Sequence, residues 1–270
     1  MLRKTVIILL MLAVFIVPTS VFASPDIYSI DGVEIPVDVV INGRILKTPV
    51  NAFLEGGTVY VPLRAIAEST GAGVLWDSET MSATVTSGEM TSTYTIGVDG
   101  YLHEGTTFVP VRKFAESLGF TVSWDGYYFQ AILTDDKTYL PDDKVETAYT
   151  NEDILLIAQV LQCECAHSSF EGKLAVANVI TNRVASPLFP ATVREVIYDR
   201  RYGSVQFTIA YNGKLNNTPN AECMLAAKCS LDGTVVAKDC LFYQAEYVKG
   251  SWMDKNRQVA GCYGGNKFFY

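Results

Sequence analysis

The chain has 270 residues, of which 49% are hydrophobic, and its formal net charge is -8 at pH 7. This hydrophobic fraction supports a sizeable core, and the length exceeds that of one typical domain, so we expect two domains. The acidic balance argues against nucleic acid as a partner, because a nucleic-acid-binding surface needs an excess of Lys and Arg.

The N-terminus has the pattern of a secretory signal peptide. Arg3 and Lys4 precede an apolar run, and the small residues Ala23 and Ser24 follow as a cleavage site. An uncleaved membrane anchor is the alternative, but the apolar run is short for a span of about 20 residues. We therefore expect residues 1–23 to be removed, the protein to be secreted, and the mature chain to have no stable membrane span.

An internal repeat follows. The segment "GTVYVPLRAIAESTGAGVLWD" from Gly57 aligns without a gap with "GTTFVPVRKFAESLGFTVSWD" from Gly105. In each copy a β-rich segment leads to a Pro that suits the start of a short helix, at 64–69 and 112–118. A Gly that can end the helix comes next, and a strand closes on Trp-Asp. The pattern predicts a strand, helix and strand module that is used twice.

This repeat resembles the stalk-type module named after the N-terminal domain of copper amine oxidases. The resemblance covers roughly residues 28–135 and implies an α+β domain, which we assign to 24–135; its ligand, the wall or a protein partner, stays open. Copper is not implied, because a copper site needs several imidazoles and the segment offers only His103. Trp76 and Trp124 occupy matching positions, where we expect core residues; a sugar-stacking surface is the alternative.

The chain changes character after this module. Charged residues and Pro141 interrupt the apolar pattern, so we place a linker at 136–151 and a second domain at 152–270. All six cysteines lie in the second domain: Cys163, Cys165, Cys223, Cys229, Cys240 and Cys262. Export favours disulfides, and we expect a Cys240–Cys262 bridge if the two C-terminal strands that these residues flank pair with each other.

Helix signals dominate the second domain. The capping pattern "TNED" at 150–153 starts a helix with apolar spacing up to Cys165. The capping-box signature "SSFE" at 168–171 starts a second helix, which is apolar on nearly every face and should be central. A third helix starts at Thr192, a fourth ends at Gly233, and "CLFYQ" and "NKFFY" are expected strands. The pattern predicts a compact, mostly helical α+β domain.

Glu164 lies at the end of the first of these helices, in the stretch "LQCECAHSSFEG". Its side chain falls on the flank of the apolar stripe, close to Ile157. The negative end of the helix macrodipole and the apolar neighbours both favour the protonated carboxyl, as a general acid near neutral pH requires. A solvated boundary residue is the alternative, and spacing alone does not decide between the two.

Five blocks of the second domain resemble, in order, the SleB/CwlJ-type cell-wall hydrolases, a family known from spore cortex-lytic enzymes. The blocks are "AQVLQCECAHSSFEGKLAVANVITNRV", "FPATVREVIY", "QFT", "LFYQ" and "GGNKFFY". The resemblance implies a lysozyme-like, lytic-transglycosylase-like fold with Glu164 as the catalytic acid. It also implies substrate-binding roles for Asn182, Arg183, Gln206 and Phe207. Helix C-terminal capping is the alternative role for Asn182 and Arg183.

The chain also departs from the family pattern. Cys163, Cys165 and His167 replace small residues around the acid, Ser168 replaces a second Glu, and Lys267 replaces a His near the C-terminus. Substrate contacts at these positions therefore stay open. The stalk-type repeats take the place of the family's usual peptidoglycan-binding repeat, which weakens a specific assignment to germination.

The resemblance implies an enzyme that cleaves peptidoglycan. Two carboxylates are usual for glycoside hydrolysis. Glu171 also matches the family motif, but helix capping explains it, so one catalytic carboxylate remains. We therefore expect a lytic transglycosylase that cuts after N-acetylmuramic acid, with a hydrolytic muramidase as the alternative.

Two other classes of function stay open. Cys163 and His167 are four residues apart and could form a thiol peptidase for peptide crosslinks, and the domain could also be a non-catalytic wall-binding protein. The cysteine spacing fits no usual zinc site, and we expect no metal and no cofactor. The expected location is the cell wall of a Gram-positive type of cell, with spore cortex and vegetative wall both open as substrates.

Overall fold

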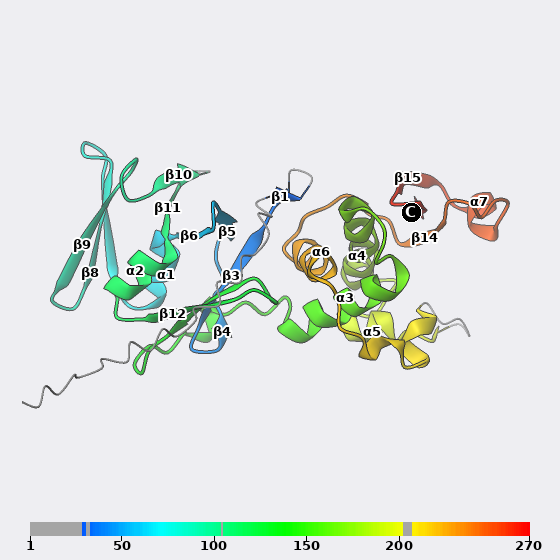
Figure 1. The fold of residues 1–270 in the computed structure, drawn as a ribbon, viewed down its shortest axis with the longest axis horizontal. Coiled ribbons are helices and arrows are strands. Elements are labelled where there is room, and N and C mark those ends of the chain that lie inside the picture. The colour runs from blue at the N-terminus through cyan, green and yellow to red at the C-terminus, as the bar shows by residue number, and fades with distance from the viewer. Residues whose placement is uncertain (1–28, 31–32, 104, 202–206) are drawn as a thin grey trace, which may run out of the picture.

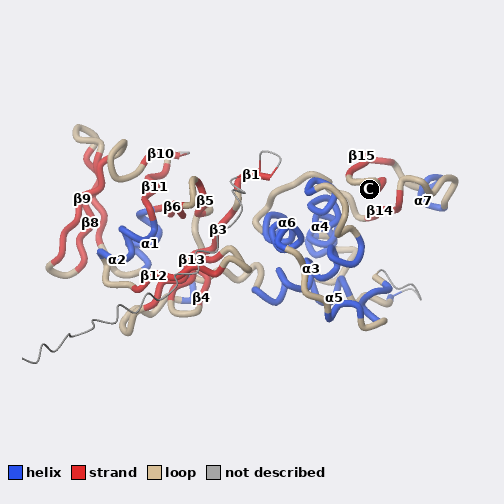
Figure 2. The backbone as a smooth tube through the Cα atoms, viewed as in Figure 1, coloured by secondary structure: helices blue, strands red, loops and turns tan. Residues whose placement is uncertain are grey.

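The computed structural model describes residues 29–30, 33–103, 105–201 and 207–270. A β-rich N-terminal part and a mostly helical C-terminal part follow one another along the long axis of the molecule (Figures 1 and 2). The expected two-part architecture is thereby confirmed. The expected signal peptide, residues 1–23, lies outside the described residues. No helix within the described ranges is long and apolar enough to cross a membrane.

The N-terminal part is built mainly from short strands. They are β1 (Ser29–Ile30), β2 (Val33–Glu34), β3 (Pro36–Ile41), β4 (Arg44–Ile45), β5 (Ala52–Glu55), β6 (Thr58–Pro62), β7 (Gly73–Asp77), β8 (Ser82–Ser87), β9 (Met90–Thr95), β10 (Tyr101–His103), β11 (Thr106–Pro110), β12 (Thr121–Asp125) and β13 (Gln130–Thr134). Two short helices, α1 (Leu63–Ser69) and α2 (Val111–Ser117), separate them. The main sheet has the order β10-β11-β6-β5-β3-β13-β12, with β4 on β3, and β7-β8-β9 form a second sheet.

The two copies of the repeat adopt the same local structure. Pro62 and Pro110 cap α1 and α2, because a Pro at a helix start loses no hydrogen bond. Gly71 and Gly119 follow at φ 81° and 92°, a conformation that favours glycine. The strands β6 and β11 pair antiparallel, so the copies meet back to back in one sheet. The predicted strand, helix and strand module is confirmed.

The two tryptophans of the repeat are not in the core. Trp76 and Trp124 are each 39% exposed, so the prediction of core positions is wrong. Each lies on the same strand face as a valine that packs in the core, Val74 or Val122, but near the end of the strand, where this face is left partly open to solvent.

The C-terminal part contains five α-helices and three strands in its described residues. They are α3 (Asn151–Glu164), α4 (Phe170–Ala185), α5 (Val193–Ile197), α6 (Ala221–Leu231), α7 (Trp252–Asn256), β14 (Phe242–Ala245), β15 (Val259–Tyr263) and β16 (Asn266–Phe269). Short 3-10 turns lie at Asp142–Lys144, Thr208–Tyr211 and Lys214–Asn216. Helix α4 packs against α3, α5 and α6, which confirms the prediction that it is central.

The helix starts follow the sequence signals with one shift. Thr150 caps α3, where its hydroxyl accepts from Asp153 N–H and the Asp153 carboxylate accepts in return. In α4 the cap is Ser169, whose hydroxyl accepts from Gly172 N–H, so the predicted capping box from 168 to 171 is wrong by one residue. Ser168 donates instead to the carbonyl of Gly264, at 3.0 Å. A long-range contact has thus replaced the expected local one.

The expected disulfide is wrong in this structure. The two expected strands, β14 and β16, do pair antiparallel, so the condition for the bridge is met, but the bridge is absent because Cys262 lies on the third strand, β15, and not next to Cys240. Cys240 is buried before β14, and Cys262 is exposed on β15. All six cysteines lie within the described ranges, and all are free thiols.

A buried polar cluster joins the two parts of the molecule. Lys228 of α6 is fully buried and lies 2.7 Å from Asp38 of β3 and 2.6 Å from Asp232. The Tyr149 hydroxyl donates to the same two carboxylates, at 2.9 and 2.6 Å. A buried charge needs partners of this kind, so the cluster fixes the registration of β3 against the helical part.

Candidate active site

Glu164 lines a cavity of about 690 Å³ between the end of α3 and the C-terminal strands. It is the last residue of α3, and it is exposed to solvent. The other described residues that line this cavity are Ser168, Arg183, Phe207, Thr208, Phe242, Tyr243, Gln244, Ala245, Tyr247, Met253, Gly264, Gly265 and Asn266. We call this cavity the Glu164 cavity. Its size suits a sugar-sized ligand.

The turn between β15 and β16 forms one wall of the Glu164 cavity by close backbone contact with α4. A Cβ added at Gly172 would lie 2.6 Å from the Cα of Gly264, so the two backbones touch. Gly264 has φ +54°, which a side chain at that position would strain. The hydrogen bond from Ser168 to Gly264 holds the same turn. Glycine at 172 therefore sets the position of the wall that faces Glu164.

We expect Gly172→Ala to destabilise the protein, although Ala is normally favoured over Gly in a helix by about 1 kcal/mol. The added methyl group meets backbone rather than a flexible side chain, and overpacking of this kind costs about 1–3 kcal/mol. Chemical denaturation measures the difference. Gly73→Ala is the control, because a Cβ at Gly73 meets nothing within 4 Å. Equal or greater stability of Gly172→Ala would contradict the close contact.

The Glu164 carboxyl has the electrostatics of a proton donor. Removal from water by the surrounding protein raises the pKa of Glu164, and Lys214 opposes this shift only in part. No described residue donates a hydrogen bond to the carboxyl, so nothing of that kind stabilises its charged form. The position at the C-terminal end of α3 acts in the same direction, because the helix dipole there repels negative charge. The sequence-based expectation that this environment favours the protonated acid agrees with the direction of the shift.

The raised pKa leads to a prediction about stability. Below the ordinary pKa of 4.5, Glu164 is neutral in both the folded and the unfolded state, so it does not affect the free energy of unfolding through its charge. Above the raised pKa it is ionised in both states, and the ionised form is less favourable in the folded state, so the wild type loses stability as the pH rises. We therefore expect Glu164→Gln to gain stability relative to the wild type as the pH rises from about 4 to 8. Denaturation midpoints at both pH values measure this gain. A relative gain by the wild type over this range would contradict the raised pKa.

Two of the other predicted site residues line the cavity. The Arg183 guanidinium is buried at the edge of the cavity, where its Nε donates to the carbonyl of Leu241 at 2.8 Å. It lies over the rings of Phe207 and Phe242, with 5.6 and 5.5 Å to the ring centroids. Burial lowers the pKa of Arg183 to about 10, so the group stays charged at neutral pH. Phe207 is itself buried and forms part of the cavity wall.

The remaining two predicted residues are placed differently. The side-chain amide of Asn182 donates to the carbonyls of Ala237 and Cys240, at 2.9 and 3.0 Å, and Asn182 does not line the Glu164 cavity. It ties α4 to the segment before β14, a contact different from the helix cap considered as its alternative, and its predicted role in substrate binding stays a prediction. Gln206 lies outside the described residues.

Sequence reasoning missed Tyr243 and Gln244, which come from β14 and line the cavity. Burial and the nearby charge of Glu164 raise the pKa of Tyr243, so its hydroxyl keeps its proton and can donate to a ligand. Gln244 is held by Asp254, which accepts from its side-chain amide at 3.1 Å. The only sequence signal was the block "LFYQ", which gave these residues a strand but no role.

The candidate Cys–His pair lies in a neighbouring cavity of about 640 Å³, which Cys163 and His167 line together with Glu164. The Cys163 thiol donates to the carbonyl of Lys214 at 3.4 Å and accepts from Asn217 at 3.2 Å. Burial and the charge of Glu164 raise the pKa of Cys163. A nucleophilic cysteine needs the opposite shift, so this environment argues against a thiol peptidase.

Comparison with known proteins identifies the two parts of the chain. Residues 167–270 match the family described as Cell Wall Hydrolase, and this match begins three residues after Glu164. Residues 40–99 and 91–159 match the Copper amine oxidase N-terminal domain. Both resemblances inferred from the sequence are confirmed.

Individual relatives match the C-terminal part. The spore cortex-lytic enzyme of Bacillus subtilis is 34% identical over 95 residues, which are 35% of this chain and 30% of that protein. The spore cortex-lytic enzyme of Oceanobacillus iheyensis is 34% identical over 103 residues, which are 38% and 36% of the two chains. The crystal structure of the catalytic domain of the Bacillus cereus SleB protein is 30% identical, with 47% of this chain and 95% of that chain covered and a TM-score of 0.42.

The chain spans about a third of the length of the curated relatives it matches. The shared segment includes the cavity-lining strands β14 and β16, which lie within 167–270. Residues 167–270 therefore belong to the cell wall hydrolase family, and in this chain they follow two copies of the copper amine oxidase N-terminal domain.

Proposed function

We propose that this protein is a secreted enzyme that cleaves the glycan strands of peptidoglycan, with Glu164 as its acid. The observation that carries the proposal is a cavity of sugar size that Glu164 lines with a raised pKa. Relatives named spore cortex-lytic enzymes support a wall substrate, either spore cortex or vegetative wall. A lysozyme-like arrangement of helices around the site is part of the proposal.

The number of carboxylates favours lytic transglycosylation. Glu164 is the one acidic side chain among the described residues that line the cavity. The segment 202–206, next to Phe207 in the chain, reads "YGSVQ" and contains no acid either. Glycoside hydrolysis ordinarily needs a second carboxylate as nucleophile or base, so the substrate has to supply the missing group.

The reaction then needs one residue in two roles. Glu164 donates its proton to the oxygen that links C1 of N-acetylmuramic acid to the next sugar, and the C1–O bond breaks. The carboxylate formed in this step takes the proton of the C6 hydroxyl of the same muramic acid, and the C6 oxygen bonds to C1. The products are a free 4-hydroxyl on the leaving sugar and a 1,6-anhydro ring on muramic acid. Glu164 ends protonated, and no water is consumed.

The surrounding residues orient the glycan in this proposal. The Tyr243 hydroxyl can donate to a sugar oxygen beside Glu164, and Arg183 presents a fixed positive edge to hydroxyl or N-acetyl groups. Phe207 is buried beneath the Arg183 guanidinium, so its proposed contribution to substrate binding is to hold Arg183 in place. Gln206 stays a proposed substrate contact from the family resemblance.

Hydrolysis is the second candidate, because Glu164 is exposed to solvent and a water molecule can reach it. Mass spectrometry of the muropeptides released from purified peptidoglycan separates the two reactions. We expect products with 1,6-anhydromuramic ends. Reducing muramic ends would replace transglycosylation with hydrolysis, and release of peptides from intact glycan strands would replace both with a peptidase.

A further inference from the structure

A second cavity, of about 520 Å³, lies in the N-terminal part, far along the chain from Glu164. The first copy of the repeat contributes α1 and β7, the adjacent strand β8 adds Ala83, and the segment from β10 to β11 closes the other side. The residues that matter here are Lys47, Arg64, Glu68, Trp76, Leu102 and Lys144. We call this the Trp76 groove. It is large enough for two linked sugars.

The chemistry of the Trp76 groove is aromatic and cationic. Trp76 is 39% exposed and Leu102 is 45% exposed, which leaves apolar surface in contact with water. Lys47 and Lys144 are exposed, and neither ammonium group forms an ion pair with a described residue. Three cations face one carboxylate in a chain whose net charge is -8. The groove is therefore locally positive, although the net charge of the protein is negative.

Arg64 and Glu68 form a fixed part of the groove. Arg64 pairs with Glu68 at 3.2 Å and also donates to the carbonyl of Val74 at 3.4 Å, so the pair links α1 to β7. This link holds the strand that carries Trp76 against the helix. Lys47 and Lys144 come from outside the repeat, and a backbone hydrogen bond from Lys47 N–H to the Lys144 carbonyl, at 2.8 Å, keeps them side by side.

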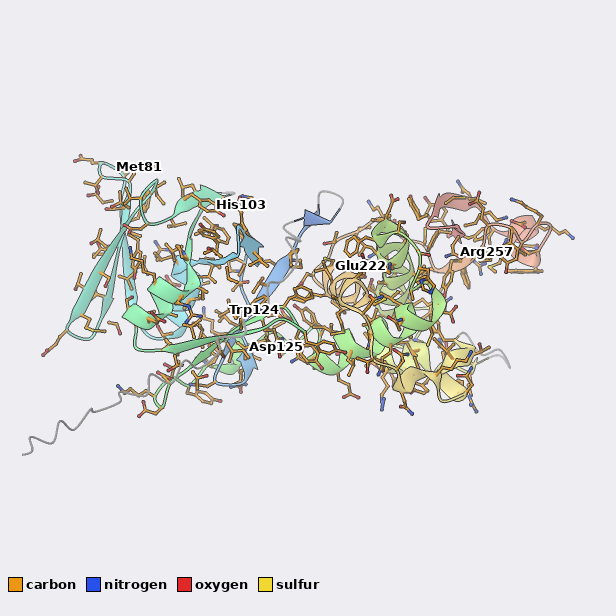
Figure 3. All side chains as sticks on the ribbon, in the orientation of Figure 1. Met81, His103, Trp124, Asp125, Glu222 and Arg257 are labelled. Atoms are coloured by element: carbon orange, nitrogen blue, oxygen red, sulfur yellow. The ribbon has the colours of Figure 1, made fainter. Side chains whose placement is uncertain are left out.

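The second copy of the repeat provides an internal comparison. Arg112 pairs with Glu116 and donates to Val122, and Trp124 is 39% exposed, as in the first copy. Yet neither Arg112 nor Trp124 lines the Trp76 groove. Trp124 lies in β12, the edge strand of the main sheet beside β13, whereas β7 belongs to the separate sheet with β8 and β9. In Figure 3 Trp124 lies toward the middle of the molecule, and Met81, at the turn after β7, lies at its far end.

We propose that the Trp76 groove is a second peptidoglycan-binding site, which holds a glycan segment that carries stem-peptide carboxylates. This proposal rests on the proposed function. A sugar ring stacks its apolar face on the indole of Trp76, and the carboxylates of the stem peptide pair with Lys47 and Lys144. Both chemical features of the groove are used, since an uncharged glycan would leave the lysines without a role.

A second site on the same chain changes how the enzyme meets its polymeric substrate. Once the Trp76 groove holds the wall, the Glu164 cavity encounters nearby glycan at a high effective concentration. The buried cluster around Lys228 keeps the two parts in a defined arrangement, so the second binding event needs little reorganisation.

Binding of the full chain to insoluble, teichoic-acid-free peptidoglycan tests the proposal. The chain carries Glu164→Gln, so that the polymer stays intact, and the fraction pelleted is measured against protein concentration. We expect Trp76→Ala to weaken binding about fivefold or more. We expect the double variant Lys47→Glu with Lys144→Glu to weaken binding by a similar factor. We expect neither this variant nor Trp76→Ala to regain the binding of the parent at low salt. Trp124→Ala is the matched control and should bind within about twofold of its parent.

The outcomes separate this proposal from the proposed function. The proposal is overturned if the parent and the charge-reversed variant bind equally well. It is also overturned if Trp124→Ala loses as much binding as Trp76→Ala does. If binding depends on Lys47 and Lys144 only when the peptidoglycan retains its teichoic acid, teichoic acid is the ligand and the proposal is overturned. The proposed function is read from a different measurement, the muropeptides that the wild-type chain releases, so one can fail while the other stands.

Discussion

Glu164→Gln is expected to lower glycan cleavage by on the order of 10²-fold or more, with the fold and glycan binding retained. Gln has nearly the same shape as Glu but no proton to transfer, and Glu164 is the one acid among the described residues of its cavity. The rate of release of soluble muropeptides from peptidoglycan measures the effect. Circular dichroism of the variant shows whether the fold is kept.

Glu171→Gln is the matched control for this experiment. Glu171 also matches the family motif, but it is exposed in the first turn of α4 and does not line the Glu164 cavity. We expect this variant to keep its activity within about twofold, because an exposed substitution away from the site changes little. Near wild-type activity of Glu164→Gln would make Glu164 a boundary residue and remove it from the site.

The raised pKa of Glu164 also sets the expected pH dependence of cleavage. A general acid acts only while it is protonated, so activity should fall as the pH rises through that raised pKa and should persist above the 4.5 of an ordinary Glu. The pH profile of kcat/KM for the wild type measures the apparent value. A profile that rises through this range would assign Glu164 the role of a base in the rate-determining step.

Local signals in the sequence predicted the elements well because their causes are local. The hydroxyl of Thr150 and the carboxylate of Asp153 satisfy the first backbone groups of α3 within four residues. The repeat was readable for the same reason, since each Pro, helix and Gly act within one short segment. The place of Glu164 at the end of α3 left its role open, the family resemblance assigned it the role of the acid, and its cavity was not predictable from either.

The cavity depends on contacts between distant segments, which no local pattern specifies. Tyr243 reaches Glu164 from a strand nearly eighty residues later, and the Gly264 turn is positioned by Ser168 and Gly172. The shift of the α4 cap from Ser168 to Ser169 has the same origin, because Ser168 is used in the contact with that turn. Trp76 and Trp124 show the limit most clearly: their local sequences match and their exposed fractions are equal, but different sheets surround them.

Lys228→Met is expected to destabilise the protein by about 3–5 kcal/mol, the cost of leaving buried carboxylates without their cation. Lys228 is fully buried between Asp38, which β3 of the N-terminal part supplies, and Asp232, which follows α6. Met has a similar volume, so the loss comes from charge rather than from a cavity. Burial already raises the pKa of Asp232, and removal of Lys228 removes the charge that opposes this shift.

The same substitution tests whether the two parts unfold together. In the wild type the cluster and the packing of Ile35 against the helical core join β3 to the C-terminal part, so we expect one cooperative transition in chemical denaturation. In Lys228→Met we expect the two parts to unfold in separate transitions.

Lys255→Met, which removes an exposed lysine on α7, is the control. It should change the free energy of unfolding by less than about 0.5 kcal/mol. Adding Asp38→Asn to Lys228→Met should recover part of the loss, because the two residues interact directly and one buried charge has then been removed. A single transition at the wild-type midpoint in Lys228→Met would show that the cluster does not couple the N-terminal part to the C-terminal part.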